Sequence, residues 1–392
     1  MNAAQSFDTS GPTRALVYLD RIAANLRGIR ERVGPGRGIL MAVKADAYGH
    51  GAVEVSRYVE REKLADWFGV ATVGEGIELR AAGIVSPIFK LSPALPAEVE
   101  AAVTHDITLA VASVAEADAV EAAAASAART VNVHVAVDTG MGRIGLAPDD
   151  VESFGAHVAQ NCPHVRVQGM FTHFAVSDVA DDDSVAFTQG QISRLREAVG
   201  AISDRLGYFV EIVHAANSGG VLAHPDSWGN LVRPGIMAYG YYPDPSTPHT
   251  IELLPALEWR APITFVKKVQ KGRSVSYGRT WTAPRDSWIA TLPVGYADGY
   301  RRLLSNTGRV LARGREYPVV GRVCMDQTMI DLGPAGAIGA PDSPLNVGEE
   351  VVLLGSDGEA RYTADEMAAH LDTIPYEVLT LIGRRVRREY VA

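Results

Sequence analysis

Eight short apolar runs alternate with helix-forming stretches over the first 240 residues of this 392-residue chain. Each run has four to eight residues and is rich in β-branched side chains, as in strands that are buried on both faces. Strands that alternate with helices form a parallel sheet, because each helix returns the chain to the start of the next strand. Eight such strands close a (β/α)₈ barrel, and an open doubly wound sheet is the alternative. The runs are 39–43, 67–71, 87–91, 107–111, 131–137, 165–170, 210–215 and 231–238.

The pattern changes after residue 240. A segment with three prolines, 241–250, indicates a loop or linker, and six short apolar runs without long helices follow it. One helix is expected near 363–371, where Thr363 and Glu366 form a capping-box pattern. We therefore predict an α/β fold, a (β/α)₈ TIM-like barrel followed by a mostly-β C-terminal domain. The expected boundaries are a tail over 1–13, the barrel over 14–247 and the β-rich domain over 248–392.

Composition excludes several classes of protein. The formal net charge of −9 argues against a broad nucleic-acid surface, and no apolar run approaches the ~20 residues of a membrane-spanning helix. The first thirteen residues lack the layout of a secretory signal, and two cysteines are consistent with a reducing compartment. The histidines and cysteines show no metal-ligand spacing. We expect a cytoplasmic protein that binds neither nucleic acid nor membrane and holds no metal.

A lysine ends the first apolar run of the predicted barrel. Residues 42–51 read AVKADAYGHG, which places Lys44 at the carboxyl end of the strand, the end where barrels carry their active sites. Apolar surroundings lower the pKa of an amine and make it nucleophilic. Alternatively, the stem of Lys44 packs against the barrel while its charged end reaches solvent.

Small and hydroxyl residues follow the last two strands. Ser218 with Gly219 follows the seventh run, and Gly235 with Ile236 lies in the eighth. Loops at these two positions of a barrel commonly bind a phosphate through backbone N–H groups and hydroxyls. A nucleophilic lysine and a phosphate site at one barrel mouth indicate pyridoxal 5′-phosphate held as a Schiff base.

The motifs of the chain, taken together, resemble those of the fold-type III alanine racemases over almost its whole length. The segment 41–51 (MAVKADAYGHG) is similar to the cofactor-lysine signature of that family. Basic amino-acid decarboxylases share the barrel but lack VSYG and GRVCMDQ. The other matching segments are VDTGMGRIG (137–145), THFA (172–175), ANS (216–218), RPGIMAYG (233–240), VSYG (275–278), PVGYADGY (293–300), GRVCMDQ (321–327) and IPYEV (374–378).

The resemblance implies a homodimeric pyridoxal-phosphate racemase that interconverts L-alanine and D-alanine, which in a bacterium would supply peptidoglycan synthesis. Lys44 would hold the cofactor and act as one base, and Tyr277 of the partner subunit would be the other. Racemisation removes a proton from one face of Cα and returns a proton on the other face. Two acid–base groups on opposite faces of Cα can carry out these two proton transfers.

The resemblance also implies roles for residues around these two bases. Arg233 would face the pyridine nitrogen, His173 would link Arg233 to Tyr277, and Arg143 would meet the phenolic oxygen of the cofactor. Met325 would line the substrate carboxylate site together with Arg143. The remaining cofactor-binding positions would be Tyr48, Asn217, Ser218, Gly235, Ile236 and Tyr376, and the substrate access path would include Asp178, Tyr296, Arg302, Arg322 and Ile374.

One position departs from the pattern of the family. Many members carry a carbamylated lysine two residues before the DTGMGR motif, where its negative charge fixes the arginine. This chain has Ala136 there, and alanine cannot carry a carbamate. We therefore expect a bound anion or water to orient Arg143.

Three alternatives remain at this stage. A racemase of serine or another small amino acid would use the same lysine and tyrosine. A decarboxylase is disfavoured by Tyr277, and a non-catalytic pyridoxal-phosphate carrier of the single-barrel kind is disfavoured by the β-rich domain.

Overall fold

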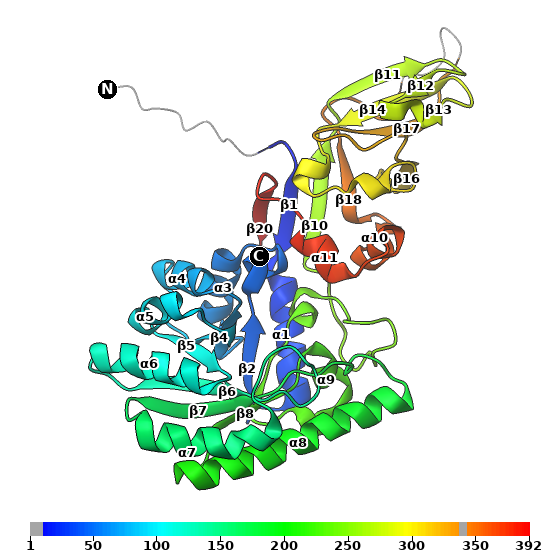
Figure 1. The fold of residues 1–392 in the computed structure, drawn as a ribbon. Helices are drawn as coiled ribbons and strands as arrows, with labels where there is room; N and C mark the ends of the chain where they lie inside the picture. The colour runs from blue at the N-terminus through cyan, green and yellow to red at the C-terminus, as the bar shows by residue number, and fades with distance from the viewer. Residues whose placement is uncertain (1–10, 337–342) are drawn as a thin grey trace, which may run out of the picture. The chain divides into compact units, whose positions relative to one another are not determined.

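The computed structural model describes residues 11–336 and 343–392 (Figure 1). The chain forms two compact units, one of residues Leu19–Pro255 and one that combines the segment up to Tyr18 with Ala256–Ala392. We call them the barrel unit and the β unit.

Eight parallel strands of the barrel unit form one sheet in the order β8-β7-β6-β5-β4-β3-β2-β9. The two end strands are joined by backbone hydrogen bonds from Asn230 N to Val213 O (3.2 Å) and from Arg233 N to Ala216 O (2.8 Å). The sheet is therefore nearly closed, and the predicted barrel is confirmed. The strands are β2 (Gly38–Ala42), β3 (Trp67–Val70), β4 (Ile88–Pro93), β5 (Ile107–Val111), β6 (Val131–Ala136), β7 (Val165–Phe171), β8 (Ile212–His214) and β9 (Leu231–Val232).

Helices follow the strands and cover the outside of the barrel (Figure 1). They bury one apolar side against the strands, as amphipathic crossover helices do. The helices are α1 (Leu19–Val33), the short α2 (Lys44–Tyr48), α3 (Ala52–Arg61), α4 (Val73–Ala81), α5 (Pro96–Thr104), α6 (Val114–Ser126), α7 (Val151–Asn161), α8 (Asp182–Leu206) and α9 (Ser218–Ala223).

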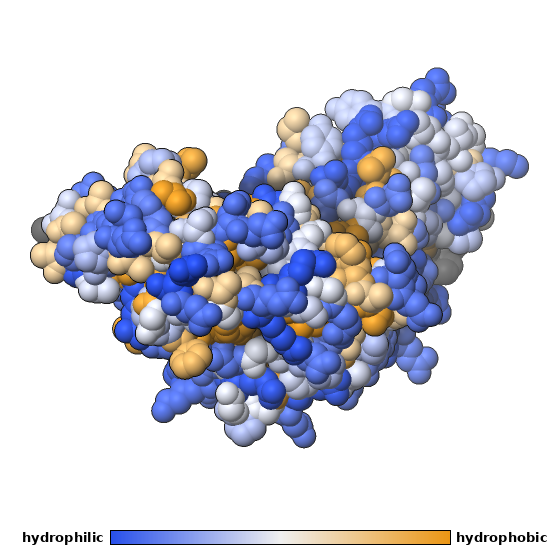
Figure 2. Space-filling model, turned by 60° about the horizontal axis from the view of Figure 1, so that its bottom comes forward, coloured by the Kyte–Doolittle hydropathy of each residue, from blue (hydrophilic) through white to orange (hydrophobic). Residues whose placement is uncertain are grey.

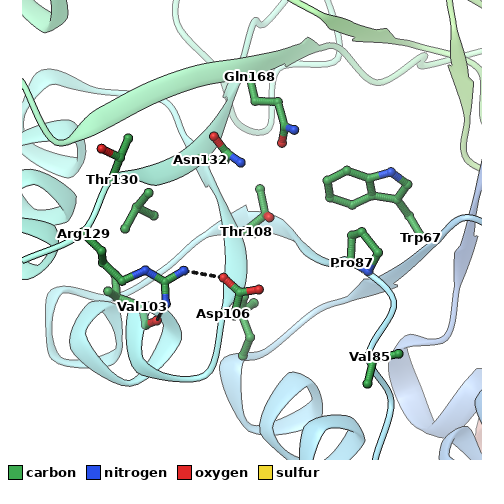
Figure 3. A pocket seen from close by; sticks show the side chains of 12 residues that line it. Trp67, Val85, Pro87, Val103, Asp106, Thr108, Arg129, Thr130, Asn132 and Gln168 are labelled. Atoms are coloured by element: carbon green, nitrogen blue, oxygen red, sulfur yellow. Dashed lines mark hydrogen bonds and ion pairs between the residues drawn. The ribbon is translucent and has the colours of Figure 1, made fainter. Parts of the chain in front are cut away.

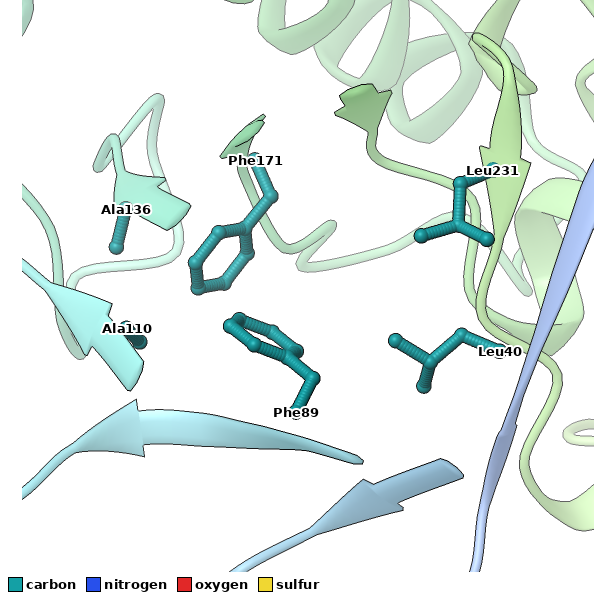
Figure 4. Packing of buried hydrophobic residues seen from close by; sticks show 6 residues of the cluster. All are labelled: Leu40, Phe89, Ala110, Ala136, Phe171 and Leu231. Atoms are coloured by element: carbon teal, nitrogen blue, oxygen red, sulfur yellow. The ribbon is translucent and has the colours of Figure 1, made fainter. Parts of the chain in front are cut away.

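The interior of the barrel holds a layer of apolar side chains that point inward from six strands (Figure 4). Each of the six is at most 4% exposed, and Ala136 of β6 is one of them. The layer fills the space below the mouth, so the barrel is a packed core rather than a pore. Its members are Leu40, Phe89, Ala110, Ala136, Phe171 and Leu231.

The β unit contains a sheet with the strand order β16-β15-β18-β10-β1-β20, in which β19 also pairs with β18. A three-stranded sheet, β11-β14-β17, and the pair β12-β13 complete it. The bounds are β1 (Arg14–Tyr18), β10 (Leu257–Pro262), β11 (Phe265–Val269), β12 (Ser274–Val275), β13 (Trp281–Thr282), β14 (Ser287–Leu292), β15 (Arg309–Ala312), β16 (Arg315–Pro318), β17 (Thr328–Pro334), β18 (Glu350–Asp357), β19 (Ala360–Tyr362) and β20 (Arg387–Val391).

Strand β1 lies between two strands that are distant in sequence. It pairs antiparallel with β10 and parallel with β20. Residues 14–18 therefore belong to the β unit, whereas the sequence assigned them to the barrel, and the barrel unit extends to Pro255 rather than residue 247. The difference arises because β1 is fixed by hydrogen bonds to residues 387–391, which no local pattern reveals.

Two helices complete the β unit, α10 (Ala364–Leu371) and α11 (Pro375–Thr380). The amide of Glu366 donates to Thr363 Oγ1 (3.2 Å), and the amide of Thr363 donates to Glu366 Oε2 (2.8 Å). The predicted capping box at the start of α10 is confirmed.

Hydrophilic residues cover most of the face drawn in Figure 2, and hydrophobic residues gather there only in small groups. Across residues 11–336 and 343–392, the helices are too short or too polar to cross a bilayer.

Candidate active site

Lys44 lies two residues after the last residue of strand β2, Ala42, at the mouth formed by the carboxyl ends of the strands. The next four residues, 45–48, have φ angles of 53° to 54°. Left-handed backbone costs about 1–2 kcal/mol for each residue that is not glycine, so the surroundings must hold this turn. One tie is the amide of Ala45, which donates to Glu75 Oε1 (2.8 Å). The strained turn fixes the direction in which Lys44 leaves the strand.

The amine of Lys44 is partly buried among other cations. Burial is the largest cause that lowers its pKa below the ordinary lysine value, and the charges of Arg143 and Arg233 lower it further. The carboxylate of Glu75 acts in the opposite direction. A lowered pKa leaves more of the amine neutral and nucleophilic at a given pH.

Arg233 is 5% exposed and is held by three backbone carbonyls and by the imidazole of His214, whose Nδ1 lies 3.1 Å from NH1. Its guanidinium donates to the carbonyls of Thr172 (2.7 Å), His214 (2.8 Å) and Ala215 (3.0 Å). The Nδ1 atom of His173 lies 3.4 Å from the same guanidinium. Burial, followed by the charge of Arg233, lowers the pKa of His173 to about 3, so this imidazole is neutral.

A hydroxyl-lined cradle lies where β8 and β9 end. The amide of Gly235 donates to Ser218 Oγ (3.1 Å), and a Cβ added to Gly235 would lie 2.6 Å from the hydroxyl of Tyr48. Only glycine therefore leaves this space open. Burial raises the pKa of Tyr48, which keeps its hydroxyl protonated and able to donate.

Asn217 and Ile236 frame the same cradle. The side-chain oxygen of Asn217 accepts from the amide of Gly220 (2.9 Å) and from the hydroxyl of Ser177 (2.8 Å), so it caps α9. Ile236 is fully buried and opens the short helix η3 (Ile236–Tyr239). Both residues hold the two loops in place around Ser218 and Gly235.

Arg143 lies in the loop that follows β6. The carboxylate of Asp138 organises this loop by accepting from the amides of Gly140 and Gly142 (3.0 Å each). Arg143 itself is exposed and makes no side-chain hydrogen bond or ion pair with the described part of the chain. A small cavity beside Ala136 is lined by Arg143, His173 and five further residues, namely Val137, Met141, Ile144, Phe171 and Thr172.

Tyr277 lies in the β unit on a strained turn. Ser276, just before it, has a φ of 67°, and the hydroxyl of Ser276 donates to the carbonyl of Arg322 (2.6 Å). The Tyr277 side chain is 73% exposed. A tightly tied turn thus presents an aromatic hydroxyl at the surface of the β unit.

Three motifs distant in sequence meet at this turn. A Cβ on Gly321 would lie 2.7 Å from the Cβ of Ser276, and the amides of Tyr296 and Ala297 donate to the carbonyls of Cys324 (3.1 Å) and Met325 (3.0 Å). The side chains of Met325 and Tyr296 are 54% and 42% exposed. The segments VSYG, PVGYADGY and GRVCMDQ therefore form one surface, and Tyr277, Tyr296 and Met325 are all exposed in it.

The remaining predicted residues divide between the two units. Arg302, Arg322, Ile374 and Tyr376 belong to the β unit, where Tyr376 lies in α11 and is half-buried. Asp178 belongs to the barrel unit, and its carbonyl accepts from the hydroxyl of Thr247 (2.9 Å). The mouth of the barrel thus brings together Lys44, Tyr48, Arg143, His173, Asn217, Ser218, Arg233, Gly235 and Ile236.

Two family models match the chain, one for each unit. The alanine racemase N-terminal domain matches residues 17–243, and the alanine racemase C-terminal domain matches residues 256–390. The chain belongs to the alanine racemase family. The alanine racemase of Cutibacterium acnes is 49% identical over 380 residues, which cover 97% of this chain and 98% of that protein.

Solved alanine racemase structures have the same fold. The enzyme of Clostridium difficile is 37% identical with a TM-score of 0.89, and the alignment covers 97% of this chain and 96% of that one. The enzyme of Bartonella henselae, solved with covalently bound pyridoxal phosphate, is 26% identical with a TM-score of 0.82, covering 97% and 100%. The resemblance found in the sequence is confirmed, and so are the activity of an isomerase acting on alanine and the dependence on pyridoxal phosphate.

The barrel mouth of this alanine racemase fits an anionic cofactor. Lys44, Arg143 and Arg233 bring three cationic groups together, and Glu75 is the carboxylate that acts on Lys44. Unbalanced positive charge attracts an anion. The open cradle at Gly235 adds the space, and the hydroxyls of Ser218 and Tyr48 add hydrogen-bonding groups.

Sequence reasoning missed Glu75 and two histidines of the barrel interior, His134 and His214. Glu75 ties the Lys44 turn to α4, and Thr72 with Glu75 forms a capping box that is visible in the sequence. His134 and His214 have no comparable local signal, because they come together only when β6, β7 and β8 lie side by side.

Proposed function

We propose that this alanine racemase interconverts L-alanine and D-alanine with two bases, Lys44 of one subunit and Tyr277 of the partner subunit. The observation that carries the proposal is the exposure of Tyr277 on a rigidly tied turn. A hydroxyl presented outward can reach a ligand that another subunit holds. In a two-fold homodimer each site would take one base from each chain.

The barrel mouth would hold the cofactor. Lys44 would bind it covalently, and its phosphate would lie among Tyr48, Ser218, Gly235, Ile236 and Tyr376. Asn217 would be a further cofactor-binding residue. When bound, pyridoxal phosphate withdraws electrons from the Cα of the amino acid and so acidifies the Cα proton. Arg233 would face the pyridine nitrogen, and because a guanidinium only donates hydrogen bonds, it leaves that nitrogen unprotonated.

Protons would move at two atoms of this protein, the Nζ of Lys44 and the hydroxyl of Tyr277. The lowered pKa of Lys44 supports its role as a base near neutral pH. A phenol becomes a base only beside cations, and the barrel mouth supplies Arg143 and Arg233. His173, next to Arg233, would link that cation to Tyr277 of the partner subunit.

Substrate and anion would meet at Arg143. Its charge, together with Met325 of the partner subunit, would receive the substrate carboxylate. The place taken by the carbamylated lysine in many family members is Ala136 here, and the small cavity beside it has Arg143 in its wall. A chloride or similar anion there would supply the negative charge that orients Arg143.

The biological role would be the supply of D-alanine for peptidoglycan in the cytoplasm of a bacterium. Rescue of a D-alanine-requiring bacterium by this chain, and failure of rescue by Lys44→Ala, would test that role in cells.

Isotope incorporation tests the two-base mechanism. With L-alanine in D₂O, D-alanine formed early should carry solvent deuterium while the recovered L-alanine stays protonated, because different groups serve the two faces. Tyr277→Phe should abolish D-alanine formation, whereas Tyr390→Phe, a control tyrosine that is 37% exposed, should not. Early D-alanine without deuterium, or an active Tyr277→Phe, would contradict the mechanism.

A further inference from the structure

A row of polar side chains leads from Arg233 into the interior of the barrel. The NH1 of Arg233 lies 3.1 Å from His214 Nδ1, and His214 Nε2 lies 2.9 Å from His134 Nδ1. Both histidines are fully buried. Beyond them the row ends at Gln168 of β7, one of the groups that act on the pKa of His134.

The hydrogen bonds of this row have one possible direction. A guanidinium can only donate, so His214 Nδ1 must accept and carries no proton. Burial keeps both imidazoles neutral, since it lowers the pKa of His134 to about 3 and that of His214 well below its ordinary value. The single proton of His214 is then on Nε2, which donates to His134 Nδ1, and the proton of His134 is on its own Nε2.

The neighbouring backbone is shaped to admit His134. The pairing of β6 with β7 shifts register between Val133 and His134, so that Gln168 is the extra residue of a β-bulge. A Cβ on Gly169 would lie 2.6 Å from the His134 ring. Glycine and the bulge thus make room for the imidazole and turn Gln168 away from the regular pattern.

Gln168 is the last residue of the row and lies towards the end of the barrel opposite the mouth. It lines a pocket at the amino ends of the strands, where its amide points towards the Trp67 ring (Figure 3). His134 Nε2 and Gln168 Oε1 are both buried, and neither has a hydrogen bond of ordinary geometry.

We propose that His134 and Gln168 are positioning residues that act through His214 to hold Arg233 at the cofactor. The inference rests on the proposed function, because that function gives Arg233 its place at the pyridine nitrogen. Simple packing does not account for the row, since buried polar groups cost free energy unless they are hydrogen-bonded and the neighbours here are the rings of Phe89 and Phe171.

Variants at position 134 separate positioning from packing. His134→Leu removes the acceptor for His214 Nε2–H, and His134→Asn keeps an oxygen near the place of Nδ1. Phe89→Leu is the packing control, because that ring contacts His134 at 4.7 Å between centroids but takes no part in the row. We expect His134→Leu to lower kcat about tenfold, the effect of one unsatisfied buried donor, with little change in KM.

Two readouts do not depend on turnover. The visible absorption of the bound cofactor should change in His134→Leu and return in His134→Asn, while Phe89→Leu keeps the absorption and kcat of the parent and loses only thermal stability. Nitrogen-15 spectra of histidine-labelled protein should show His134 and His214 as Nε2–H tautomers, with the His214 signal shifted or lost in His134→Leu. Gln168→Leu should lower kcat about two- to threefold. This variant replaces His134→Leu in the test if His134→Leu does not fold.

Three outcomes would overturn the proposal. The first is an Nδ1–H tautomer at either His134 or His214. The second is that both His134→Leu and Gln168→Leu keep the absorption and the kcat of the parent. The third is that Phe89→Leu and His134→Leu lose the same share of kcat and that His134→Asn does not restore it. The tautomers are measured on the parent protein without cofactor. Failure of the parent to form D-alanine would instead reject the proposed function, so the two failures are distinguishable.

Discussion

The two units carry their functional residues in opposite ways. In the barrel unit Arg233 is 5% exposed and donates to three backbone carbonyls, whereas Tyr277 of the β unit is 73% exposed on its surface. The barrel fixes charges around a place for an anionic ligand. The β unit fixes the backbone next to Tyr277 and leaves the Tyr277 side chain exposed. The comparison teaches that the barrel unit holds its charged groups in fixed places inside, while the β unit holds an aromatic hydroxyl outward; in the proposed function that hydroxyl acts on a ligand bound by the partner subunit.

The largest effect is expected from loss of the barrel lysine. Lys44→Ala should lower D-alanine formation by more than about a thousandfold, because in the proposed function it removes both the covalent attachment and one base. Borohydride should fix the cofactor of the parent protein on a peptide that contains Lys44. Lys90, a buried lysine of β4 whose amine donates to Pro93 O (2.7 Å), is the control, and a label on Lys90 would contradict the assignment.

Mixing two inactive variants tests whether the two units serve different subunits. Lys44→Ala and Tyr277→Phe, unfolded and refolded together, should regain about a quarter of the parental sites, since half of the dimers are mixed and each has one intact site. If both bases came from one chain, every site would keep a lesion. No recovery, with mixed dimers confirmed by mass spectrometry, would therefore reject the shared site.

The cradle of the barrel should tolerate no added atom at Gly235. Gly235→Ala places a Cβ 2.6 Å from the Tyr48 hydroxyl, and we expect the Kd for pyridoxal phosphate to rise about tenfold or more. Gly200→Ala in α8 is the matched control, because its Cβ would meet nothing within 4 Å. Titration of the apoprotein with the cofactor measures both, and equal Kd values would mean that the cradle is not the phosphate site.

Anion dependence tests how the barrel orients Arg143. We expect chloride to activate the parent protein by a few-fold at constant ionic strength, because no carboxylate pairs with Arg143 in the described residues. Ala136→Lys should weaken this dependence. Activity that is flat across chloride in the parent, with other anions excluded, would count against a bound anion.

The smallest effect is expected from loss of a helix N-cap, and the same change can be made in both units. Thr72 caps α4 of the barrel unit and Thr363 caps α10 of the β unit, each in a capping box. Either threonine changed to alanine should cost about 1 kcal/mol of stability. Only Thr72→Ala should also lower kcat, because its partner Glu75 holds the turn beside Lys44. Equal kcat values for the two variants would remove the proposed link between α4 and Lys44.

The barrel could be predicted from the sequence because each of its strands is a local apolar run with a local boundary. Lys44 could also be found, since its position at the end of a strand carries chemical meaning without any other residue. Helix α8 begins at Asp182, where the Asp181 side chain accepts from Ser184 N and caps it.

The remaining features depend on contacts between distant residues. No local signal distinguishes Tyr277 from the other aromatic residues of the chain, so only the family resemblance marked it in the sequence. The contact of His134 with His214 joins residues 80 apart and exists only once three strands have paired. Strand β1 likewise needs β20, whose residues come more than three hundred positions later.

The pairing of β1 with β20 has a consequence for how this protein is made. During synthesis Arg14–Tyr18 leaves the ribosome more than three hundred residues before Arg387–Val391. The whole of Leu19–Pro255 can fold in the interval, since N-terminal domains generally fold first. Until β20 has been made, the edge of β1 that faces it has no strand to pair with, and an unpaired edge is where another chain can add. The unit that carries Tyr277 is thus the one most exposed to misassembly in the growing chain.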